Sequence, residues 1–192
     1  LLALPAAVAL AILALPLVST LYQYGKFTVD DALQTRAALL GYSIGLPALV
    51  FVKILAPGFY ARQVMSTPVK IAFVTVLITQ TLAVIFAWPL GLEQAGLTLA
   101  TSVGACFNAA LLLRFLVRKG FYQPQPGWTR FALQVVAALV VMGAVLWFAM
   151  GPVQSWLLGG SLARASRLIL VVGAGALAYF AVLAALGVRP RD

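Results

Sequence analysis

The sequence predicts an all-α, polytopic bundle of about six transmembrane helices. Hydrophobic residues make up 64% of the 192 residues and charged residues only 9%, whereas about a quarter of the residues in a soluble domain are charged. The mean hydropathy is +1.06, and the apolar runs are too long and too continuous for barrel strands. This composition excludes a soluble enzyme and a disordered tail. The single cysteine, Cys106, excludes a disulfide scaffold and is expected to be a small core residue.

Six apolar runs are long enough to cross about 30 Å of hydrocarbon, which takes roughly 20 helical residues. The first run has neither a methionine nor a basic leader, so we expect no signal peptide and a piece of a longer protein, or a chain that lacks its front. We expect Ala56-Pro57-Gly58 to stop the second helix, and Thr67 to cap the third, with Pro68 in its first position. The predicted spans cover about residues 1–18, 32–56, 68–88, 94–117, 128–150 and 162–186.

The distribution of basic residues predicts the orientation. Six spans place both termini on one side of the membrane, and cytoplasmic loops are enriched in Lys and Arg. One side receives eight basic residues and the other three, so we expect the first side and the C-terminus in the cytoplasm. Arg164 and Arg167 oppose this trend, and we expect them to bind headgroups or neighbouring helices. The eight are Arg62, Lys70, Arg114, Arg118, Lys119, Arg130, Arg189 and Arg191, and the three are Lys26, Arg164 and Arg167.

The ionisable residues exclude most catalytic chemistry. The absence of histidine removes His-based triads and His-based metal sites. All acidic residues lie at span ends or at the terminus, so no carboxylate proton relay crosses the membrane. We therefore predict that the chain is not an enzyme and holds no metal or cofactor. The net charge of +9 follows from cytoplasmic loops, so no nucleic-acid partner is predicted. The acids are Asp30, Asp31, Glu93 and Asp192.

The second span carries two charges, Arg36 and Lys53, where intramembrane charge is expensive. Seventeen residues place them about 25 Å apart along a helix axis. In one interpretation both side chains extend to opposite membrane surfaces. In the other they line a polar cavity and bind an anionic substrate, together with Ser43, which shares the helical face of Arg36.

The same span contains a candidate hinge at Gly45 and Pro47. Pro47 lacks the N–H that would bind the carbonyl of Ser43, so the helix can bend or break there. Interrupted helices are typical of transporter sites, although prolines are common in membrane helices.

Polar and small side chains lie on single faces of three other spans. Hydrogen-bonded helix packing is the favoured interpretation of the polar sets, and a hydrophilic cavity wall is the alternative. The small-residue stripe favours close packing, with a groove for a lipid chain as the alternative. The polar sets are Thr98, Thr101, Ser102 and Asn108, and Thr75, Thr79 and Gln80; the stripe is Ala174, Ala178, Ala181 and Ala185.

Four segments carry a resemblance to a known family. They are LYQYGKFT (21–28), KILAPGFYARQ (53–63), TPVKIA (67–72) and QPQPGW (123–128). In this order, and over essentially the whole chain, they resemble the bacterial lipid II flippase family, MurJ or MviN. LAPGFYARQ followed by TPVKIA is the specific pair.

The resemblance implies the C-terminal portion, helices nine to fourteen, of a fourteen-helix protein of the multidrug/oligosaccharidyl-lipid/polysaccharide exporter superfamily. Residues 1–118 would form four spans of the transport lobe, and residues 119–192 two further spans with a groove for the lipid tail. The family moves lipid II, an undecaprenyl-pyrophosphate-linked disaccharide pentapeptide, from the cytoplasmic to the periplasmic leaflet of the inner membrane by alternating access. This transport serves peptidoglycan synthesis, cell wall biogenesis and cell shape.

The implied partners are lipid II, membrane lipids and the N-terminal helices of the same protein. The resemblance places Arg36 and Lys53 on the cavity helix. Some members bind sodium partly through acidic residues on the helix that matches the third span; this sequence has no acid there. The alternatives are an exporter of another lipid-linked oligosaccharide or of a drug, and a membrane scaffold that transports nothing.

Overall fold

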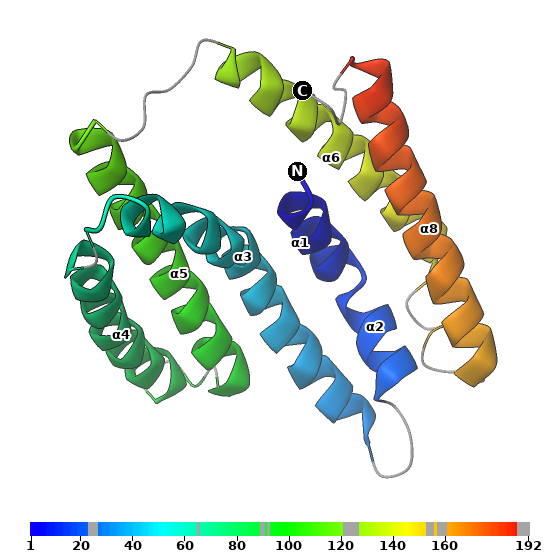
Figure 1. The fold of residues 1–192 in the computed structure, drawn as a ribbon. Helices are drawn as coiled ribbons and strands as arrows, with labels where there is room; N and C mark the ends of the chain where they lie inside the picture. The colour runs from blue at the N-terminus through cyan, green and yellow to red at the C-terminus, as the bar shows by residue number, and fades with distance from the viewer. Residues whose placement is uncertain are drawn as a thin grey trace. The chain divides into compact units, whose positions relative to one another are not determined.

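A computed structural model describes residues 1–22, 27–64, 66–88, 91, 93–120, 127–152, 156 and 161–187. All regular structure within these ranges is helical, which confirms the predicted fold class (Figure 1). Five helices are long and apolar enough to cross a membrane, or six spans if the bent pair at the start is counted as one. The helices are α1 (Ala3–Ile12), α2 (Ala14–Leu21), α3 (Val29–Tyr60), α4 (Ser66–Ala87), α5 (Glu93–Arg118), α6 (Trp128–Met150) and α8 (Ser161–Ala185).

The first predicted span is two helices and not one. α1 and α2 meet at Leu13 with a bend of 74°, and Leu13 has a non-helical ψ of 14°. Pro16 explains the break, because it has no N–H for the carbonyl of Ile12 and its ring would clash with that carbonyl in a continuous helix. The first predicted span, over about residues 1–18, is therefore a broken one that ends at Leu21.

The second predicted span is longer than expected, because α3 begins before Ala32 and continues through Pro57 to Tyr60. Ala61 N–H donates to the carbonyl of Pro57 at 2.9 Å, so helical bonding resumes after the proline. Phe59, one residue before the helix end, is fully buried. Its burial outweighs the local preference of Ala56-Pro57-Gly58 to end a helix.

α3 ends in a Schellman motif. Val64 N–H donates to the carbonyl of Phe59 at 3.1 Å, and Gln63 N–H donates to that of Tyr60 at 3.0 Å. Gln63 has a left-handed φ of 57°, as this motif requires at that position. α4 then begins at Ser66, so Thr67 lies inside its first turn and is not the residue before it; the start was predicted to within two residues.

The chain divides into two compact units, 37–124 and the remainder (1–36 with 125–192). In the first of these, α3, α4 and α5 share an apolar core of Leu55, Phe59, Ile71, Leu112 and Leu116. In the other, α1, α6 and α8 pack around a core that includes Leu13, Met142, Leu146 and Tyr179. The predicted division of roles at residue 118 stays a prediction.

Glycines bring α3 and α5 into close contact. A Cβ atom at Gly45 would lie 2.5 Å from Ser102 Oγ and 2.6 Å from Ser102 Cα, and one at Gly41 would lie 2.6 Å from Thr98 Oγ1. Ser102 Oγ–H donates to the carbonyl of Gly41 at 2.6 Å. Gly41 and Gly45 are spaced as G-x-x-x-G, the pattern that lets membrane helices approach closely.

Cys106 is exposed, and the prediction that it belongs to the core is wrong. The packed face of α5 runs through Ser102, Ala105, Ala109 and Leu112. Cys106 follows Ala105 by one residue, which turns its side chain about 100° from that of Ala105 and places it at the edge of the packed face.

Substitution of Gly45 tests the contact between α3 and α5. Gly45→Ala in the intact protein is expected to lower the free energy of unfolding by about 1–3 kcal/mol, because the added methyl overlaps Ser102. Gly173→Ala is the matched control: it is a helical glycine whose added Cβ would meet no atom of another element within 4 Å. We expect the control to be neutral or stabilising by up to about 1 kcal/mol. Thermal unfolding in detergent measures both, and equal stability of the two variants would contradict the close approach.

Candidate functional site

A capping box positions the start of α3, the helix that carries the candidate cations. Thr28 N–H and Thr28 Oγ1–H both donate to Asp31 Oδ2, at 2.9 and 2.7 Å. Asp31 N–H donates back to Thr28 Oγ1 at 3.2 Å. This reciprocal arrangement satisfies backbone donors at the helix N-terminus and places a carboxylate beside its positive end. It accounts for a helix start ahead of the predicted Ala32.

The three candidate substrate-binding residues occupy two different environments on α3. The side chains of Arg36 and Lys53 are exposed. Ser43 is buried, and its Oγ–H donates to the carbonyl of Leu40 at 2.7 Å. The hydroxyl proton of Ser43 is therefore used within its own helix, and only its acceptor lone pairs remain for another group. The structure does not place Ser43 together with either cation.

The candidate hinge residues lie inside an uninterrupted helix. α3 continues past Pro47, which is half-buried, although Figure 1 shows that its C-terminal part turns away from the direction of the part before it. Gly45 is buried against Ser102 and so has a packing role that the sequence prediction did not assign to it. A hinge at these positions stays a prediction.

The polar side chains of the other spans mainly form hydrogen bonds to carbonyls of their own helix or of a neighbouring helix. Ser102 bridges α5 to α3, which is the interhelical packing favoured from the sequence. Thr75, Thr98 and Thr101 donate to carbonyls of their own helices, at 2.8–3.3 Å. Thr79 contacts the position that a Cβ on Gly104 would occupy, so it also lies in a helix contact.

The small-residue stripe of α8 does not make the close contact within its unit. Ala174, Ala181 and Ala185 are exposed, and Ala178 is half-buried. Gly175 makes the contact with α6 instead, since a Cβ there would lie 2.5 Å from Leu146 Cδ2. The stripe is therefore available to lipid or to another helix.

Two openings border α6 and α8, one apolar and one with polar residues in its lining. One, of about 210 Å³, lies between α1, α6 and α8 and is lined almost entirely by apolar side chains, with Tyr179 among them. The other, of about 470 Å³, lies where Gln134 Nε2–H donates to the carbonyl of Leu186 at 2.9 Å. Ala185 of the stripe and Arg130 both line this second opening. A groove for a lipid tail along the stripe stays a prediction.

Two arginines near the start of α8 bind the carboxyl ends of other helices. Arg164 Nη1–H donates to the carbonyl of Ser19 on α2 at 3.1 Å, and Arg167 Nη2–H donates to that of Met150 on α6 at 2.8 Å. These carbonyls carry the negative end of the helix dipole, so each cation is well placed. Of the two partners expected from the sequence, headgroups or neighbouring helices, the structure shows neighbouring helices.

Trp156 also takes part in the contact between Arg167 and the end of α6. The sequence analysis did not select it as a candidate. Its Nε1–H donates to the carbonyl of Met150 at 2.9 Å, and its ring lies 4.7 Å below the Arg167 guanidinium. Gly151 has a φ of +64° and passes so close that a Cβ would lie 2.8 Å from Arg167 Nη2. A signal was available in the sequence: cations in the first turns of a helix oppose their own dipole, which suggests that they serve another helix end.

Among the described residues, no group of three or more metal-binding side chains occurs. The described residues offer exposed cations on α3, hydrogen-bonded helix contacts and an apolar opening between α1, α6 and α8.

Comparison with known proteins finds one family. Residues 1–166 match the family described as lipid II flippase MurJ. The chain is 49% identical over 150 residues to a lipid II flippase MurJ of Burkholderia cenocepacia, covering 78% of this chain and 29% of that protein. It is 38% identical over 192 residues to a probable lipid II flippase MurJ of Vibrio cholerae (100% and 36%), and 33% identical over 192 residues to one of Haemophilus influenzae (98% and 36%). The chain thus spans about a third of the length of these relatives.

Arg167→Met tests the contact at the carboxyl end of α6. It removes the cation but keeps an apolar stem, and we expect a loss of about 1–3 kcal/mol in the free energy of unfolding, the range for a hydrogen bond to a charged group. Arg130→Met, at an exposed arginine on α6, is the control and should change stability by less than about 0.5 kcal/mol. Thermal unfolding in detergent reports the change. An Arg167→Met variant as stable as the wild type would show that the contact contributes nothing.

Proposed function

Because the chain belongs to the lipid II flippase family MurJ, we propose that it forms the C-terminal part of a flippase for lipid II. The match over residues 1–166 carries this proposal. The substrate would move from the cytoplasmic to the periplasmic leaflet of the inner membrane by alternating access, without covalent chemistry. Since the chain spans about a third of its relatives, the remaining helices would supply the other lobe and the rest of the substrate site.

Arg36 and Lys53 are the proposed substrate contacts within this chain. Lipid II carries a pyrophosphate, and an anion leaves water at a high free-energy cost unless charged donors receive it. Arginine and lysine form charge-assisted hydrogen bonds to phosphate oxygens. Both side chains are exposed on α3, which is compatible with facing a cavity in the intact protein. Ser43 is a weaker candidate, because its hydroxyl proton is already used.

We propose that α3 bends at Pro47 as the cavity alternates between the two sides. The proline leaves the carbonyl of Ser43 without its helical donor, so bending there breaks no further backbone bond. Gly45 would keep α3 against α5 through Ser102 during this motion. The exposed stripe from Ala174 to Ala185 would face the polyprenyl tail, because small side chains leave room for a chain to lie along the helix.

The cytoplasmic C-terminus is also part of the proposal. The eight-to-three distribution of basic residues supports this orientation. Arg164 and Arg167, two of the three, bind helix ends, so packing accounts for their place on the side with fewer charges.

Alanine substitution tests the two cations. Arg36→Ala and Lys53→Ala in the intact protein should each reduce lipid II flipping about tenfold or more, as expected for loss of a hydrogen bond between charged groups. Arg36→Lys should retain more activity, because it keeps the charge. Flipping in liposomes and growth of a flippase-depleted strain are the measurements, with membrane protein levels as the control. Normal growth of the double alanine variant would remove the substrate role and leave snorkelling as the explanation.

Cysteine labelling tests the orientation. With Cys106 replaced by serine, cysteines at Gln123 and Lys26 should react with impermeant reagents from opposite sides, Gln123 from the cytoplasm. If both cysteines react from the same side, the odd number of membrane crossings predicted between Lys26 and Gln123 is wrong.

A further inference from the structure

The bent pair of helices α1 and α2 is bonded to α8 at both of its ends. Tyr179 Oη–H donates to the carbonyl of Leu1, just ahead of α1, at 2.8 Å. Arg164 Nη1–H donates to the carbonyl of Ser19, in the last turn of α2, at 3.1 Å. Tyr179 and Arg164 are 15 residues apart on α8 (179 − 164), about 22 Å along the helix axis. One helix therefore holds the whole bent pair.

Both carbonyls need a donor from outside their own helix. The residue four places after Leu1 is Pro5, which has no N–H to donate. Ser19 belongs to the last turn of α2, where carbonyls have no partner within the helix. An unbonded carbonyl is costly where water is absent. Each bond to α8 therefore fills a vacancy that the sequence of the bent pair creates.

The middle of the bent pair packs against α6. Leu13, at the bend, is 1% exposed and shares an apolar core with Met142 of α6. A Cβ atom at Gly143 would lie 3.5 Å from Ile12 Cδ1 and 3.9 Å from Val8 Cγ1, so the next residue of α6 contacts the C-terminal half of α1. The bend is thus buried by its neighbours.

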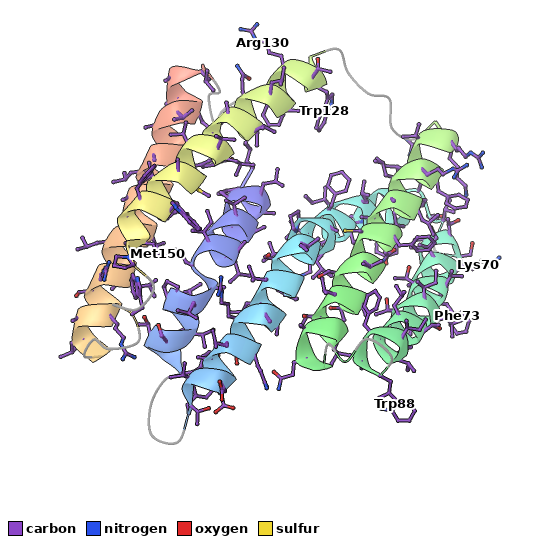
Figure 2. The ribbon with its side chains drawn as sticks, turned by 180° about the vertical axis from the view of Figure 1, so that it is seen from behind. Lys70, Phe73, Trp88, Trp128, Arg130 and Met150 are labelled. Carbon is purple, nitrogen blue, oxygen red and sulfur yellow. The ribbon has the colours of Figure 1, made fainter. Side chains whose placement is uncertain are left out.

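α6 and α8 are also joined to each other. Arg167 Nη2–H donates to the carbonyl of Met150 at 2.8 Å, and Figure 2 shows Met150 at the end of α6. Gly175 of α8 lies against Leu146 of α6. Bonds and close contacts therefore connect α8 to both ends of the bent pair, α6 to its middle, and α6 to α8.

We propose that the bend between α1 and α2 is fixed, and that α1, α2, α6 and α8 move as one body during transport. Broken helices are common at transporter sites, where parts of the protein rock against each other. Here, straightening the 74° bend would break at least one bond to α8 and uncover Leu13. The first span then acts with the two C-terminal spans and not with the transport lobe, where the resemblance placed it.

The proposal rests on the proposed function, because it concerns the transport cycle. It adds that the opening between α1, α6 and α8 keeps its size in every state of that cycle, since its three walls do not move apart.

Distances between spin labels test whether the bent pair is held. In the intact protein with Cys106 replaced by serine, one label pair is placed at Leu4 and Leu177 and another at Leu21 and Leu162, all of which are exposed. The first pair reports on α1 and α8, and the second on α2 and α8. Each should give one narrow distance distribution in the resting protein, and lipid II should not shift it.

Removal of the two bonds supplies the contrast. Tyr179→Phe combined with Arg164→Gln should broaden both distance distributions, because neither end of the bent pair is then bonded to α8. The matched control combines Tyr60→Phe with Arg130→Gln, which makes the same chemical changes at exposed residues, and should leave both distributions narrow.

A disulfide tests whether transport needs motion within the body. The Cβ position of Gly143 lies 3.9 Å from Val8 Cγ1, which is within reach of a bond between two cysteines. In the Cys106→Ser protein, Val8→Cys with Gly143→Cys should form this bond on oxidation. Lipid II flipping in liposomes should then proceed at the same rate in the oxidised and the reduced protein.

Several outcomes would overturn the fixed bend: two distances or a lipid II-dependent shift in the unsubstituted protein, a disulfide that does not form, or flipping that oxidation abolishes and reduction restores. If the variant without the two bonds does not fold, the unsubstituted distances and the disulfide decide. If the Cys106→Ser protein does not flip lipid II at all, the proposed function fails, while the label distances still test the bend.

Discussion

The backbone of this protein must satisfy its hydrogen bonds without water, and the rest of the structure depends on that constraint. Within a helix the constraint is met locally, but hydrocarbon offers no partner for a helix end or for an interrupted turn. Where α2 and α6 end, their carbonyls accept hydrogen bonds from Arg164 and Arg167 of α8. Where α3 and α5 meet, Ser102 donates to a carbonyl that Gly41 leaves accessible. Polar residues that lower the hydropathy of these helices thus form the hydrogen bonds between them.

Most of the fold could be predicted from hydropathy, because a membrane imposes length and polarity directly on the sequence. The bounds of α4, α5, α6 and α8 were predicted to within two residues. The errors concern prolines. Pro16 breaks its helix, whereas Pro57 does not, although buried residues flank both prolines. Phe59, just after Pro57, is held in a core built with α4 and α5.

The candidate residues were predictable to a smaller extent, since their roles depend on neighbours that a single sequence does not name. The cations of α3 were found because charge inside an apolar run is conspicuous. The packing role of Gly45 was readable from the G-x-x-x-G spacing but was assigned to bending. The sequence analysis placed Cys106 in the core because small apolar residues are usually buried, but its side chain is exposed in the structure. Trp156 lies in no apolar run, and its partners come from α6 and α8.

The contacts of α5 have a consequence for how this protein can vary. Ser102 lies against α3, while Gly96 and Gly104 lie against Phe86 and Thr79 of α4. Two faces of one helix are therefore closed to larger side chains, and enlargement on either face would push a neighbouring helix away. α5 should therefore tolerate larger side chains at fewer positions than a helix with a single packed face.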